Sequence, residues 1–156
     1  MDKSDPPTSF GVFKPVGHTV IAFESAALVQ AASSALLAQG FEASDMVHYT
    51  PGEMVAQVDA QVANASPLAS VGQDLNLIMA HRALAEKGCS FLVVHAATDK
   101  TAASVDAVVH GMHATAAQRY GMFIVEELVD PPAGTVQSFE SPDKGLDLAI
   151  PGENTV

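Results

Sequence analysis

Runs of apolar residues divide the chain into strands and helices. Residues 18–24 (HTVIAFE) and 91–94 (FLVV) are short, partly β-branched runs, the pattern of strands covered on both faces. Residues 45–50 and the stretch from Tyr120 to Val129 predict two further strands. Between them, Val105, Val108, Val109 and Met112 recur at offsets of three, four and seven, so the sequence predicts a helix with one apolar stripe.

Capping residues place the ends of the predicted helices. Ser25 precedes an Ala-rich helix that Gly40 ends, and Thr98 or Asp99 starts the helix of the apolar stripe. The sequence TPGE at 50–53 is a capping box, which begins a helix that runs to about Asn64. A further helix is expected from Ser66-Pro67 to Gly88.

Two parts of the chain share one order of elements. Residues 18–50 and 90–123 each read as a strand, a capped helix and a second strand. Two such units predict an α+β domain of the ferredoxin-like β-α-β-β-α-β kind, with an antiparallel sheet and a helical insertion (51–87) between strands two and three. We expect this domain to span 10–130, after a disordered arm (1–9) and before a largely disordered acidic tail (131–156).

The apolar strands raise the question of what covers the second face of the sheet. If both repeated helices lay on one face, the other would expose a larger apolar patch than soluble monomers tolerate. The insertion 51–87, a second subunit, or both must cover it. We expect a homodimer.

Composition narrows the classes of partner. A net charge of −11 speaks against nucleic acid and anionic membranes as partners, and the seven basic residues form no stripe. Cys89 is the only cysteine, which excludes an intrachain disulfide and fits a reducing compartment. The first residues lack the apolar core of a signal peptide, and no apolar run is long enough to span a bilayer. These features predict a cytoplasmic protein.

A resemblance adds to this picture. The segment 18–50, with a strand, a helix and the motif GFEASDMVHY, resembles the bacterial general stress protein 17M-like family, also called heat-induced stress proteins. This resemblance implies a stress-associated ferredoxin-like domain without assigned chemistry, and it carries over no catalytic residue. The insertion 51–87 and the segment AHRALAEKG look closer to uncharacterised proteobacterial proteins than to the core of that family.

Polar residues at strand ends and beside apolar stripes are the candidates for a ligand site. His48 and His95 stand on strands expected to be neighbours, so their side chains could approach each other. Separate surface residues and a core-edge histidine are the structural alternatives. The ligand-binding candidates are His48, Tyr49, His81, Arg82, His95, Arg119 and Tyr120.

Other chemistry has less support in the sequence. His110 and His113 stand about one turn apart and are the candidates for half of a metal site, although histidines near a helix end also suit the helix dipole. Cys89 is expected to be buried and inert. No catalytic set, glycine-rich phosphate loop or cofactor motif is recognisable.

Three hypotheses of function follow. The first is a non-enzymatic, stress-related regulatory or interaction domain. The second is a small-molecule binder or enzyme of the dimeric α+β-barrel type, in which two sheets enclose a pocket. The third is metal binding through histidines.

Overall fold

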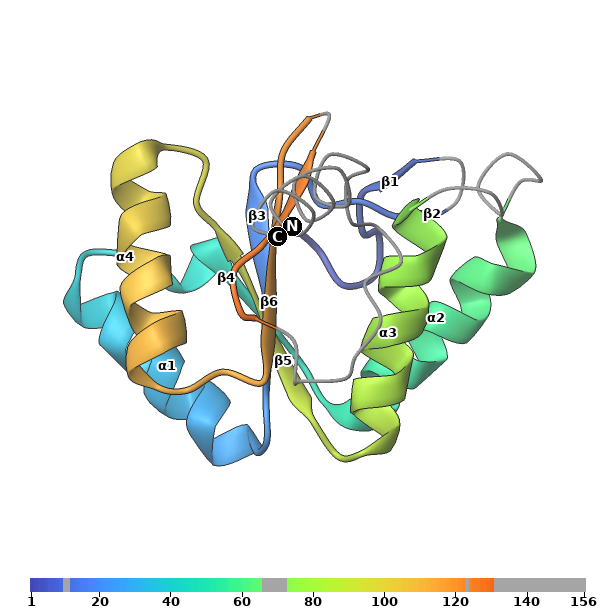
Figure 1. Cartoon of the computed structure of the whole chain (residues 1–156), viewed down its shortest axis with the longest axis horizontal. Coiled ribbons are helices and arrows are strands. Elements are labelled where there is room, and N and C mark those ends of the chain that lie inside the picture. The colour runs from blue at the N-terminus through green and yellow to red at the C-terminus, as the bar shows by residue number, and fades with distance from the viewer. Residues whose placement is uncertain (10–11, 66–72, 123, 131–156) are drawn as a thin grey trace, which may run out of the picture.

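The chain forms an α+β structure around one five-stranded antiparallel sheet (Figure 1). The computed structural model describes residues 1–9, 12–65, 73–122 and 124–130. The strand order is β4-β5-β3-β6-β7. The bounds are β3 His18–Phe23, β4 Met46–Tyr49, β5 Ser90–His95, β6 Ala116–Tyr120 and β7 Val125–Glu127. A separate two-stranded sheet pairs β1 (Thr8–Ser9) with β2 (Val12–Phe13).

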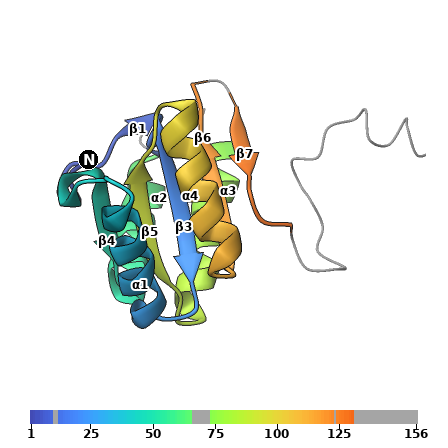
Figure 2. The same cartoon turned by 90° about the vertical axis from the view of Figure 1, so that its left-hand side faces the viewer.

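Two helices cover each face of the large sheet. Helices α1 (Ala26–Ala38) and α4 (Asp99–Gly111) lie on one face, and α2 (Pro51–Asn64) and α3 (Gln73–Glu86) lie on the other (Figures 1 and 2). The predicted insertion therefore covers the second sheet face within one chain. A second subunit is therefore not needed to bury this face, and the homodimer stays a prediction that light scattering tests.

The residues of β3 alternate between two apolar cores. Val20 and Ala22 face α2 and α3, whereas Ile21 and Phe23 face α1 and α4. All four are at most 2% exposed. Burial of a large apolar side chain contributes about 1.5–3 kcal/mol, so both helical layers are needed to keep this central strand dry.

Helix ends follow the capping signals closely. The Ser25 hydroxyl accepts a hydrogen bond from the Leu28 N–H, and Thr50 and Glu53 form the predicted reciprocal capping box. At the end of α1, the N–H of Phe41 donates to the carbonyl of Leu36 across Gly40, whose φ is +100°. Gly88 has φ +99° and ends α3 in the same way.

The last part of the sheet differs from the prediction. The prediction of a single strand from Tyr120 to Val129 was wrong. The strand β6 ends at Tyr120, and β7 pairs with it antiparallel as a new edge strand. The N–H of Gly121 donates to the carbonyl oxygen of Ile124 at 2.8 Å, and a Cβ on residue 121 would stand 2.9 Å from that oxygen. The glycine is therefore needed for the reversal. The sheet consequently has one strand more than the predicted four-stranded arrangement.

The ends of the chain were predicted as an arm and a tail. Within 1–9, Thr8 and Ser9 pair with β2, and the Lys3 ammonium lies 2.8 Å from the Glu53 carboxylate on α2. The predicted tail 131–156 and the helix start at 66–72 lie outside the described residues. Among the helices that the structure describes, none has the length and apolarity to cross a membrane.

Replacing Gly40 by alanine should lower the free energy of unfolding by about 1 kcal/mol, because alanine is disfavoured at positive φ. A Cβ there would meet nothing within 4 Å, so the loss would report backbone strain alone. Gly52→Ala is the matched control, since a Cβ at this helical position also meets nothing within 4 Å. The control should gain roughly 0.5 kcal/mol. Urea denaturation measures both, and equal effects would contradict the assigned helix end.

Candidate functional site

A pocket of about 300 Å³ opens between the end of α1 and the beginning of α4. Its α1 side consists of Gln39, Gly40 and Phe41. Its α4 side consists of Thr98, Lys100, Thr101 and Ser104. Asp45, His95 and Ala97 complete the lining. A cavity of this size is at the lower end of the range for small-molecule sites, so it suits a small ligand.

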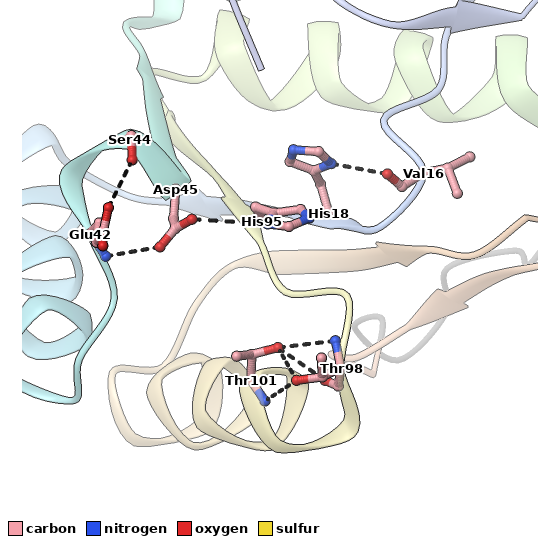
Figure 3. Close-up of polar contacts among 8 residues, drawn as sticks. All are labelled: Val16, His18, Glu42, Ser44, Asp45, His95, Thr98 and Thr101. Carbon is pink, nitrogen blue, oxygen red and sulfur yellow. Dashed lines mark hydrogen bonds and ion pairs between the residues drawn. The ribbon is translucent and has the colours of Figure 1, made fainter.

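Asp45 and His95 both line the pocket, at the edge where β4 begins and β5 ends (Figure 3). Asp45 directly precedes β4, and its Oδ2 accepts a hydrogen bond from the Glu42 N–H at 2.9 Å. Its Oδ1 lies 3.9 Å from Nδ1 of His95, at the end of β5. This distance is within the range of an ion pair but too long for a hydrogen bond. The His95 side chain is 53% exposed, so it is available to a ligand.

The first turn of α4 supplies hydrogen-bond donors. Thr98 and Thr101 cap the helix by bonding each other's backbone N–H groups, each at 3.1 Å. The N–H groups of Asp99 and Lys100 have no partner inside the helix, as is general for a first helical turn. The Lys100 ammonium pairs with no carboxylate among the described residues. Donors and positive charge therefore gather on this side of the pocket.

The predicted approach of His48 and His95 does not occur. His48 pairs with Leu92, whose side chain lies in the core under α1 and α4. His95 instead pairs with His18, and it shares the parity of Val93, which faces α2 and α3. The two histidines therefore stand on opposite faces of the sheet. The order of neighbouring strands alone could not predict which histidines lie opposite each other, because this depends on the register of the strands.

Tyr49 and Tyr120 are core residues rather than rim residues. Both are 1% exposed on the α2–α3 side of the sheet. Burial raises the pKa of Tyr49 to about 12 and raises that of Tyr120 as well. Neither phenol oxygen has a hydrogen-bond partner in the part of the chain that the structure describes. The two tyrosines hold the α2–α3 layer through their rings.

The two candidate arginines already have carboxylate partners. Arg82 lies on the exposed side of α3, where its guanidinium is 2.7 Å from Asp59 and 2.9 Å from Glu86. Arg119 bridges Asp106 on α4 and Glu126 on β7, the latter at 3.1 Å. These ion pairs raise the pKa of Arg82. Both guanidinium groups are engaged in links between elements.

His81 takes part in a buried polar chain. It is 1% exposed, and its Nε2 lies 3.0 Å from Oε1 of Gln118 on β6. The Gln118 amide donates in turn to the Glu127 carboxylate at 2.7 Å. This fixes the amide orientation, so Gln118 presents an oxygen and His81 must donate from Nε2. The chain ties α3 to β6 and β7.

The remaining predicted residues lie away from the pocket. His110 is in the last turn of α4, where its Nδ1 lies 2.8 Å from the Asp106 carbonyl oxygen, and His113 follows the helix with φ +53°. The two histidines are therefore not successive positions on one helical face. Cys89 is buried, and burial raises the pKa of its thiol. The described residues contain no group of three or more His, Cys, Asp or Glu side chains that could hold a metal.

Asp45, Lys100 and His18 were not among the candidates from the sequence. The capping signal at Thr98 already placed the start of α4, and this start could have pointed to Lys100. His18 and Asp45 become relevant only through the strand register, which no local pattern specifies.

Comparison with known proteins yields no relative. No protein-family model matches the chain, and neither the curated proteins nor the solved structures contain a match to it.

The buried His81 predicts a pH dependence of stability. Burial lowers the pKa of His81 below its ordinary value of 6.5. Below that pH the unfolded chain binds a proton that the folded chain does not, so the free energy of unfolding should fall as the pH decreases. The slope from this group is at most about 1.4 kcal/mol per pH unit. His81→Leu should flatten the dependence between about pH 7 and pH 5 in urea denaturation.

The control for this experiment is His110→Leu, at an exposed position. Burial also raises the pKa of Glu127. The contribution of this group to the free energy of unfolding is therefore present at low pH and is lost as the pH rises through the raised pKa. Because both variants keep Glu127, the difference between them isolates His81. Equal slopes in His81→Leu and the unchanged protein would contradict the prediction.

Proposed function

We propose that the chain is a non-enzymatic regulatory or interaction domain that binds a small polar anion in the pocket between α1 and α4. The observation that carries the proposal is the meeting of Lys100, the first turn of α4 and His95 at one cavity of about 300 Å³. A carboxylate or phosphate group would accept hydrogen bonds from these donors.

The charge distribution supports an anion at this place in particular. The protein as a whole carries a net charge of −11, so its long-range field repels anions. Lys3, Lys14, Arg82 and Arg119 each pair with a carboxylate. Lys100 has no such pair within the described ranges and stands beside helix donors, so the attraction is local. Asp45 and Gln39 would accept hydrogen bonds from a donor elsewhere on the ligand.

The alternative of a dimeric α+β barrel has less support. Such a barrel needs two sheets that face each other across a pocket, and α2 and α3 already cover the sheet face opposite α1 and α4. A ferredoxin-like core extended by β7 is our proposal for the fold, supported by the order β4-β5-β3-β6 of the first four strands of the large sheet. The stress-related role stays a prediction from the resemblance.

Titration of the ¹⁵N-labelled protein with inorganic phosphate and with malonate tests the proposal. The amide signals of Thr98, Lys100 and Thr101 should shift in a saturable manner at millimolar concentrations. Lys100→Ala should weaken the binding roughly three- to tenfold, since an exposed charge contributes about 1 kcal/mol.

Lys87→Ala is the matched control, because Lys87 is also exposed and pairs with no carboxylate in the described ranges, but lies beyond the end of α3. This variant should bind the anions like the unchanged protein. The proposal fails if neither anion shifts these signals, or if both lysine variants lose affinity equally.

A further inference from the structure

His18 and His95 form a cross-strand pair at one end of the sheet. They occupy directly opposite positions in β3 and β5, and their ring centroids are 5.0 Å apart (Figure 3). Asp45, the residue before β4, lies beside His95 with its Oδ1 3.9 Å from Nδ1 of that ring, so a carboxylate and two imidazoles lie in a row at this end of the sheet.

The Nδ1 atom of each ring is directed to an oxygen of the protein. Nδ1 of His18 lies 3.1 Å from the carbonyl oxygen of Val16, and a carbonyl can only accept, so this nitrogen carries the proton. Nδ1 of His95 faces Asp45 at 3.9 Å. In the neutral His18 ring the lone pair is then on Nε2, and the Nε2 atoms of both rings have no hydrogen-bond partner among the described residues. Metal-binding histidines show this arrangement, with the second nitrogen held by a carbonyl or carboxylate.

The backbone under the pair is held firmly. The N–H of Gly17 donates to the Tyr120 carbonyl at 2.8 Å, and the N–H of Ala96 donates to the Gly17 carbonyl at 2.9 Å. The positive φ of Gly17, +82°, brings the chain into β3 at this point. Sites on strands keep their geometry better than sites on loops, so the two rings need only side-chain rotation to bring their nitrogens together.

We propose that His18 and His95 bind one divalent transition-metal ion through their Nε2 atoms, with Asp45 orienting His95. Imidazole nitrogens suit Zn²⁺, Ni²⁺ and Cu²⁺ and do not suit Mg²⁺ or Ca²⁺. Two nitrogens each about 2.0–2.1 Å from the ion lie roughly 3.3 Å apart, within reach of rings whose centroids are 5.0 Å apart.

The protein supplies two ligands, and water or an added ligand completes the coordination. This agrees with the lack of any group of three or more suitable side chains in the described ranges. The proposal goes beyond anion binding in the pocket and does not depend on it.

Calorimetric titration of the untagged full chain with ZnCl₂ and NiCl₂ at pH 7.5, without any pocket ligand, tests the proposal. We expect one ion per chain and no heat with MgCl₂. His18→Gln and His95→Gln should each weaken Zn²⁺ binding at least tenfold, and Asp45→Asn should weaken it several-fold.

The double variant His110→Gln with His113→Gln is the matched control, because it removes two histidines that lie close together in sequence at the end of α4. It should bind Zn²⁺ within twofold of the unchanged protein. His95→Gln changes an exposed side chain, and circular dichroism confirms that each variant is folded. Absence of Zn²⁺ binding at millimolar concentration, unchanged binding in both single variants, or loss confined to the double variant would overturn the proposal. None of these outcomes bears on phosphate or malonate in the pocket.

Discussion

The structure depends on a sheet whose central strands are apolar on both faces. β3 and β5 place residues such as Val20 and Val93 on one side and Ile21 and Leu92 on the other, all at most 1% exposed. Such strands are stable in water only with a helical layer on each face. The helices α2 and α3 are for this reason a structural necessity, not an appendage to a two-layer domain.

Local signals predicted the helices well because capping is local chemistry. Ser25, Thr50 and Thr98 each accept a hydrogen bond from a backbone N–H within three residues, so sequence and geometry coincide. The hairpin after Tyr120 was missed because it depends on the close contact between Gly121 and the carbonyl oxygen of Ile124. The periodicity of apolar residues does not encode such a contact. The candidate site was predicted less well than the fold, since His95 was recognised without its partners His18 and Asp45.

Buried polar groups connect the α2–α3 layer to the strands. His81 and Gln118 form a buried hydrogen bond, and Gln61 accepts from the Phe13 N–H at 3.0 Å. These bonds attach α3 to β6 and α2 to β2, so they specify how helices 51–87 sit on an otherwise non-directional apolar surface. The same burial removes Tyr49 and Tyr120 from any ligand site, which explains why polar residues near strand ends misled the sequence-based prediction.

The helices on both faces of the sheet also determine which polar side chains of the strands reach solvent. Because helices cover both faces, the polar side chains of the central strands β3 and β5 reach solvent only near the strand ends. At the end where β5 finishes, Asp45 and His95 line the pocket with the first turn of α4, and His18 stands opposite His95 on β3. A cavity and a pair of imidazoles lie together there because one register aligns the strand ends and one capping box starts the helix.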